Sequence, residues 1–198
     1  MRPVFGVHIN QVFIGSCTNG SYSDFKKAAA VLKGHQVAES VSLVCGISSR
    51  QIYLKLMEDG VIGDLLNAGA RVLELACGPC CGIGCAPNSK GVSVRTSNRN
   101  FKGRSSTPDA SLYLVSPETA AATAIKGVFA TADEVMDDVS VLASIKEPDA
   151  YPVNDSLFLQ PAPEGNDVTI VRGPNIKPLP VADPPEDTLT ARVSLKAR

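Results

Sequence analysis

The sequence lacks the features that would place it in several large classes of protein. Its net charge is −1 at pH 7, so it has no basic excess with which to hold a nucleic acid or an anionic membrane surface. No apolar run is long enough to cross a bilayer, and the first residues lack the apolar core of a signal peptide. We therefore expect a cytoplasmic protein with neither nucleic-acid nor membrane partners.

The sequence also contains no tryptophan and only two histidines, His8 and His35, which lie in no recognisable motif. Cysteine, in contrast, is frequent for a chain of 198 residues. In a reduced cytosolic chain of this size, clustered cysteines indicate a metal site or redox chemistry more often than disulfides. The six cysteines lie at positions 17, 45, 77, 80, 81 and 85.

Strand and helix signals alternate along the first part of the chain. This order is typical of a parallel α/β sheet, and the apolar, β-branched strands suit burial on both faces. We therefore expect a three-layer α/β/α domain with a mostly parallel sheet over residues 1–150. The spacing predicts strands at 11–15, 41–46, 71–76, 92–96 and 111–115, and helices within 21–34, 49–60, 61–70 and 117–126.

The remaining residues, 151–198, have a different composition. They hold eight of the fourteen prolines and few strand or helix signals apart from a strand at 167–171. This pattern predicts an extended connector. The chain closes on the strand-like stretch 190–196, so we expect the connector to lead toward a further domain outside these residues.

Four of the six cysteines lie in a long loop, rich in glycine and proline, between residues 76 and 110. Its stretch ACGPCCGIGC contains the Cys-x-x-Cys pair Cys77 and Cys80. Pro79 and the flanking glycines favour a tight turn at this pair. Thiolates are soft ligands that suit iron–sulfur clusters or zinc. This loop follows the third strand, and Cys17 follows the first, so in a parallel sheet all three cysteines would meet at the carboxyl edge.

Several interpretations of the cysteines stay open at this point. Cys45 lies within a strand and is expected to be a small buried apolar residue. Cys81 and Cys85 are compatible with a packing role or with a role as additional metal ligands. A non-catalytic zinc site would close with Cys85 as a fourth thiolate, whereas a redox Cys-x-x-Cys pair would normally open a helix.

Two arginines, Arg99 and Arg104, lie in the stretch TSNRNFKGRSS. Two guanidinium groups repel each other unless an anion joins them, and arginine binds carboxylate or phosphate in a bidentate manner. The alternative is that both are solvated surface residues.

Four stretches resemble the aconitase family, which includes aconitate hydratase, homoaconitase and the large subunit of isopropylmalate dehydratase. The similarity extends from about residue 10 to about residue 195. It implies the fold of the family's iron–sulfur domain, the third of four, followed by the linker to the fourth. The stretches are IGSCTNGSYSD, ACGPCCGIG, SNRNFKGRSSTPDASLYLVSPETAAATAIKG and RGPNIKPLP.

The resemblance also implies the roles of particular residues. Cys17, Cys77 and Cys80 match the cysteines that hold a [4Fe–4S] cluster in the family. Arg99 and Arg104 match substrate-binding arginines, and Asn98 lies beside the cluster in the same motif. Cys81 and Cys85 depart from the small or apolar residues expected at their positions, and CGISSRQ departs from the expected turn before the second helix.

The activity implied is that of a hydro-lyase of the tricarboxylic acid cycle, which converts citrate to isocitrate through cis-aconitate. The Gly-Pro insert between Cys77 and Cys80 favours aconitate hydratase. Homoaconitase, the large subunit of 3-isopropylmalate dehydratase and a non-catalytic cluster or zinc module are the alternatives. No stretch matches the family's acid–base groups, so we expect the chain to need the remaining domains, in cis or in trans, and to be inactive alone.

Overall fold

The computed structural model describes residues 4, 6–156, 158–161, 169–184, 187, 188, 190 and 192. The chain divides into two units, Met1–Asp155 and Ser156–Arg198. None of the helices in the described residues has the length and apolar character needed to cross a bilayer.

Five strands form one sheet in the order β3-β2-β1-β4-β5, and every neighbouring pair is parallel. The parallel α/β sheet predicted from the sequence is therefore confirmed, with the carboxyl ends of all strands at one edge. The third strand is much shorter than expected, because the chain leaves the ladder soon after Leu73 donates its amide to the Cys45 carbonyl. The strands are β1 Gln11–Gly15, β2 Ser42–Gly46, β3 Arg71–Val72, β4 Val92–Arg95 and β5 Ser111–Leu114.

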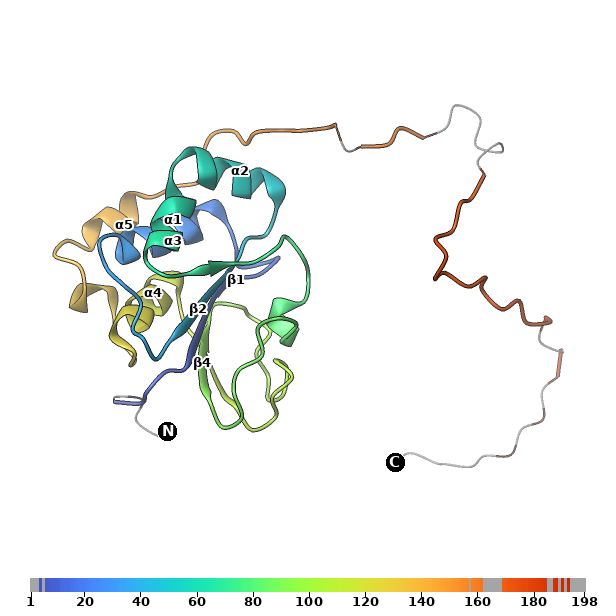
Figure 1. Cartoon of the computed structure of the whole chain (residues 1–198), viewed down its shortest axis with the longest axis horizontal. Helices are drawn as coiled ribbons and strands as arrows, with labels where there is room; N and C mark the ends of the chain where they lie inside the picture. Colours follow the sequence, from blue (N-terminus) through green and yellow to red (C-terminus); the bar gives the residue numbers. More distant parts are fainter. Residues whose placement is uncertain are drawn as a thin grey trace. The chain divides into compact units, whose positions relative to one another are not determined.

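All five α-helices contribute side chains to one core on one face of this sheet. Figure 1 shows the arrangement of these helices and the sheet. Val12 and Ile14 of β1 point into this core, where they pack with fully buried side chains such as Phe25 and Leu65. The helices are α1 Tyr22–Leu32, α2 Arg50–Glu58, α3 Val61–Asn67, α4 Pro117–Lys126 and α5 Ser140–Ser144.

The opposite face of the sheet carries a smaller apolar cluster. Phe13 and Val44 alternate with the residues of the main core and pack there with Cys85. Cys85 belongs to the loop between β3 and β4, which contains only the short 3₁₀ helix Pro79–Cys81. This loop packs on that face of the sheet, and its glycines and prolines do not favour an α-helix.

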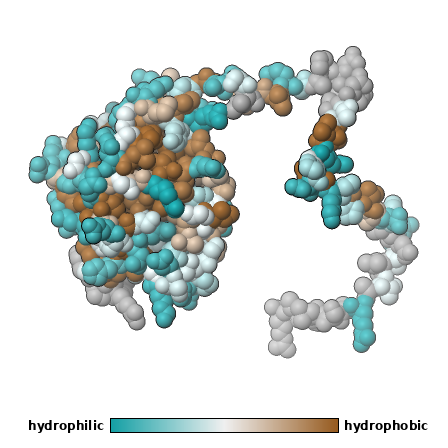
Figure 2. Space-filling view, viewed as in Figure 1, coloured by the Kyte–Doolittle hydropathy of each residue, from teal (hydrophilic) through white to brown (hydrophobic). Residues whose placement is uncertain are grey.

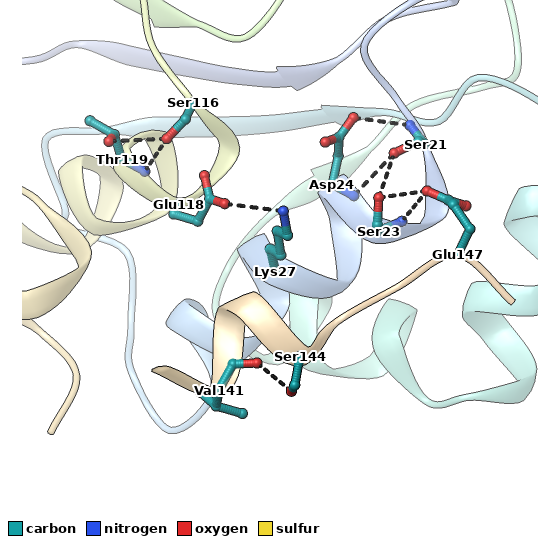
Figure 3. Close-up of polar contacts among 10 residues, drawn as sticks. All are labelled: Ser21, Ser23, Asp24, Lys27, Ser116, Glu118, Thr119, Val141, Ser144 and Glu147. Carbon is teal, nitrogen blue, oxygen red and sulfur yellow. Dashed lines mark hydrogen bonds and ion pairs between the residues drawn. The ribbon is translucent and has the colours of Figure 1, made fainter. Parts of the chain in front are cut away.

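Side-chain caps define where α1 begins (Figure 3). The Ser21 hydroxyl accepts a hydrogen bond from the Asp24 amide, and the Asp24 carboxylate accepts one from the Ser21 amide, which forms a capping box. Glu147 accepts hydrogen bonds from the amide and the hydroxyl of Ser23, so the segment after α5 is tied to the first turn of α1.

The second unit contains no helix or strand among its described residues. The strand predicted at 167–171 is absent at 169–171, and residues 167 and 168 lie outside the described residues. Apolar side chains along this unit are exposed, including Ile170, Leu179 and Val181. Figure 2 shows hydrophobic groups, in brown, alternating with hydrophilic ones along this segment. The domain boundary at residue 150 and the connector's role as a lead to a further domain stay predictions.

Candidate functional site

Three loops at the carboxyl edge of the sheet surround a pocket of about 110 Å³. The loop after β1 contributes Cys17, the loop after β2 contributes Ile47, and the loop after β3 contributes Cys77 and Cys80. The parallel topology thus brings the three cysteines singled out from the sequence to the same pocket, although sixty residues separate Cys17 from Cys77.

The backbone after β1 holds Cys17 out of the core. Gly15 and Ser16 have positive φ angles of 111° and 138°. A Cβ atom on Gly15 would lie 2.1 Å from the Gly46 carbonyl oxygen, so only glycine fits this approach of β1 to β2. The Ser16 hydroxyl accepts hydrogen bonds from the amides of Thr18 and Asn19, at 3.3 and 3.1 Å, which stabilises the turn. Cys17 is consequently exposed on a loop.

The Cys-Gly-Pro-Cys stretch forms a compact turn. The amides of Cys81 and Ile83 both donate to the Gly78 carbonyl, at 2.8 and 3.1 Å. Cys77 is exposed and Cys80 is half-buried. This turn begins a 3₁₀ helix of three residues, whereas a redox Cys-x-x-Cys pair normally begins an α-helix.

The other three cysteines are placed differently. Cys45 is fully buried, and burial raises the pKa of its thiol to about 12. Cys85 is only 2% exposed and faces Phe13, so the fourth cysteine of the zinc alternative does not line the pocket. Cys81 adjoins Cys80, and burial, with a further contribution from Cys80, raises the pKa of Cys81.

The two arginines from the sequence motif have different surroundings. Arg104 donates from Nη2 to the Cys80 sulfur at 3.7 Å, and this hydrogen bond raises the pKa of the Arg104 guanidinium. Its Nε is buried and has no hydrogen-bond partner within the described residues. Arg99 is exposed beside Asn98, and the Asn98 amide donates to Asn19 Oδ1 at 3.3 Å, which joins the loops after β4 and β1.

One further residue contacts the cysteine loop and was missed in the sequence. Arg95, the last residue of β4, is 1% exposed and donates to the carbonyl oxygens of Pro79 and Cys85. The pKa of Arg95 is lowered, mainly because the side chain is buried. The alternation in VSVR predicts the position of Arg95. Val92 and Val94 share the apolar face of the strand, so Arg95 lies on the face opposite the helices.

The donor set fits a cluster bound through sulfur. In the described residues, no three histidine, cysteine, aspartate or glutamate side chains are already grouped to hold a metal ion. Three thiols nevertheless line one pocket, two of them exposed, and Arg104 offers positive charge beside one of them. Soft sulfur donors without nearby histidine favour an iron–sulfur cluster or zinc over harder ions.

Fold and site together define an α/β protein with a cysteine-lined pocket at the carboxyl edge of a parallel sheet. The sequence profile of the "Aconitase family (aconitate hydratase)" matches residues 2–127. The chain therefore belongs to the aconitase family.

Similar proteins carry more specific names. The chain is 46% identical over 137 residues to the 3-isopropylmalate dehydratase large subunit 2 of Archaeoglobus fulgidus, which covers 69% of this chain and 33% of the relative. It is 44% identical over 139 residues to the homoaconitase large subunit of Thermus thermophilus, covering 70% of this chain and 33% of the relative. The chain thus spans about a third of the length of these relatives. Their names support the alternatives given above better than the citrate interpretation, and they do not support a place in the tricarboxylic acid cycle.

Proposed function

We propose that the chain forms the cluster-binding and substrate-binding part of a hydro-lyase that dehydrates a hydroxy acid carrying two or more carboxylates. The 3-isopropylmalate dehydratase and homoaconitase activities named for its relatives are the preferred candidates. Citrate, the substrate first inferred from the Gly-Pro insert, ranks below them.

The convergence of Cys17, Cys77 and Cys80 on one pocket carries this proposal. These three thiolates would hold a [4Fe–4S] cluster. When bound, such a cluster supplies a Lewis acid that makes the hydroxyl of the substrate a better leaving group.

The arginine loop would bind the substrate beside the cluster. Arg104 already contacts Cys80, so its guanidinium is within reach of a carboxylate bound next to that residue. The guanidinium has five N–H donors, so the hydrogen bond to Cys80 leaves others for such a carboxylate. Arg99 and Asn98 are exposed on the same loop and would contact a second carboxylate or the hydroxyl group.

The proton acceptor of the reaction would come from outside this chain. His8 and His35, its only histidines, do not line the pocket. The relatives are named large subunits, which supports a partner subunit in trans. The remaining domains in cis are the other source of these groups.

Anaerobic reconstitution with iron and sulfide tests the proposal. We expect about four irons per chain in the wild type and a marked loss in Cys17→Ser, Cys77→Ser and Cys80→Ser. Cys45→Ser is the matched control and should retain the iron, because that thiol lies in the helical core. A Cys85→Ser variant that loses iron as completely as Cys77→Ser would contradict the three-ligand proposal.

A further inference from the structure

Among the described residues, Arg95 is the largest fully buried side chain, at 1% exposure. Its guanidinium lies over the Phe13 ring, 5.4 Å from the ring centroid. A buried charge is costly unless it is paired, and it is usually paired with a carboxylate. Among the described residues, however, no carboxylate forms an ion pair with Arg95.

Neutral oxygens accept every hydrogen bond that Arg95 donates. Nε donates to the Ser93 hydroxyl and Nη2 donates to Gln11 Oε1, both at 2.9 Å. Gln11 Oε1 also accepts a hydrogen bond from the Ser93 hydroxyl, so the two acceptors are themselves held in place. These contacts orient the guanidinium toward the loop between β3 and β4.

The remaining donors reach two points of that loop. Nη2 donates to the Cys85 carbonyl at 2.9 Å, and Nη1 lies 3.5 Å from the Pro79 carbonyl. Pro79 lies between the two cysteines of the Cys-Gly-Pro-Cys stretch. At the end of the loop, Gln11 Nε2 also donates to the Cys85 carbonyl, at 3.4 Å. One buried side chain thus bridges the turn that carries Cys80 and the end of the loop.

Outside the Cys77–Cys80 turn, the loop also accepts hydrogen bonds from the sheet: Arg71 Nη2 donates to the Gly84 carbonyl at 2.7 Å, and Gln11 Nε2 donates to the Ala86 carbonyl at 3.5 Å. Its apolar contact with the sheet in the described residues is the small cluster around Phe13, Val44 and Cys85. The planar guanidinium presents five N–H donors in a rigid fork that matches several separated acceptors, whereas the ammonium of lysine presents three donors on a single nitrogen. This difference accounts for an arginine at a position where an apolar side chain would otherwise avoid the cost of burying a charge.

We infer that Arg95 is a positioning residue that holds the Cys77–Cys80 turn in its binding conformation before any cluster binds. The role of the turn as a ligand loop rests on the proposed function, but the anchoring of the loop by Arg95 does not. The buried positive charge also favours an anionic group at the turn, such as a cluster bound by three thiolates.

Amide hydrogen exchange of the metal-free chain tests the anchoring directly. The amides of Cys81, Gly82, Ile83 and Cys85 are hydrogen-bonded within the loop, so each reports its opening. In Arg95→Gln we expect exchange at these four amides to accelerate about tenfold or more, while amides in the middle of α1 change far less. Unchanged loop exchange, or an equal acceleration in α1, would overturn the inference.

Two further variants complete the experiment. Arg95→Lys keeps the charge but not the planar fork, so it should accelerate loop exchange in the same direction, and it serves if Arg95→Gln does not fold. Arg50→Gln removes an exposed arginine on α2 and should leave the loop amides unchanged. If the loop amides of Arg95→Lys exchanged at the wild-type rate, the anchoring role would be overturned.

Iron retention after reconstitution provides the second readout. Arg95→Gln should release its iron several-fold faster than the wild type and Arg50→Gln under the same anaerobic chelator challenge. A wild-type chain that binds no iron would defeat the proposed function, and the exchange data of the metal-free chain would still decide the role of Arg95. Equal iron release, with accelerated loop exchange, would restrict Arg95 to anchoring the free loop and overturn its role in cluster binding.

Discussion

At the scale of single residues, burial separates cysteines that are chemically identical. Cys17 and Cys77 are exposed at the pocket, whereas Cys45 is fully buried with a pKa raised to about 12. A thiol must lose its proton to bind a metal, so the exposed cysteines are the better ligands. Cys85 illustrates the opposite case, because its side chain packs on the sheet while its carbonyl accepts from Arg95.

Arg104→Lys should reduce kcat/KM about 10- to 100-fold in a complex that contains the partner subunit or domains. Lysine keeps the charge but loses the paired donors, and a hydrogen bond between charged groups contributes about 1.5–3 kcal/mol. Steady-state kinetics with 3-isopropylmalate and homocitrate as substrates measure the effect. Lys102→Arg, on the exposed part of the same loop, is the control. Unchanged kcat and KM in Arg104→Lys would return Arg104 to a purely structural role.

Asp59→Asn should weaken the pH dependence of the free energy of unfolding at acidic pH. The Tyr22 hydroxyl donates to Asp59 Oδ2 at 2.5 Å and Lys55 Nζ to Oδ1 at 2.9 Å, and these hydrogen bonds lower the pKa of Asp59 from its ordinary 3.8. Because the folded pKa is depressed, the stabilisation is complete above pH 3.8 and is lost as the pH falls through the folded value. Urea unfolding should therefore show a larger deficit at pH 7 than near pH 3. An equal deficit at both pH values, or the same behaviour in the exposed control Glu39→Gln, would exclude this linkage.

At the scale of elements, close backbone contacts hold the loops of the site together. Gly82 has a φ angle of 95°, and a Cβ atom there would lie 2.3 Å from the Ser105 carbonyl oxygen. The Ser106 hydroxyl donates to the Cys81 carbonyl at 2.5 Å in the same region. The cysteine loop and the arginine loop therefore form one packed unit, and a change in either should affect the other.

Gly82→Ala should destabilise this unit more than Gly84→Ala does. Both glycines have positive φ angles, but a Cβ atom on Gly84 would have no atom within 4 Å. The comparison thus separates the steric clash from the backbone strain, and we expect an additional loss of about 1–3 kcal/mol in the free energy of unfolding for Gly82→Ala. Urea titration of the two variants measures this difference. Equal losses would mean that the loop relaxes away from Ser105 at no cost.

At the scale of the whole molecule, the first unit has its own core but an open site. Large apolar side chains of the site loops are exposed, with Leu75 at 41%, Phe101 at 66% and Ile83 at 71%. Exposed apolar groups around a binding site are typical of a surface that a partner covers. Electrostatic binding of a substrate is also weakened where water is not excluded.

We predict that the reconstituted chain alone does not turn over 3-isopropylmalate, homocitrate or citrate. The proton acceptor and the walls of the site would be missing, and the open cluster would be labile in air. Absorbance of the unsaturated product, followed under nitrogen, provides the measurement. Sustained turnover that scales with chain concentration and disappears in Cys77→Ser would show that these residues contain a complete active site.

Local sequence patterns predicted the strands and α-helices from β1 to α4 in the observed order, and they identified the candidate ligands. The buried strand β1 and the ends of α4, with Ser116, Pro117 and Gly127, were predicted correctly because these features depend on neighbours a few residues apart. The Cys-Gly-Pro-Cys turn was also predicted from local residues. The placement of Cys17 beside it followed from one topological rule, that loops after parallel strands meet at the carboxyl edge.

The groups that support these residues follow from long-range contacts that no local pattern specifies. The hydrogen bond from Arg95 to Gln11 joins residues 84 positions apart, and nothing in the local pattern of either strand specifies it. The same holds for the burial of Cys85 and for the loop that covers the second face of the sheet. Periodicity reports which side of an element is apolar, but the partner of a buried polar group depends on contacts that exist only once the sheet has formed.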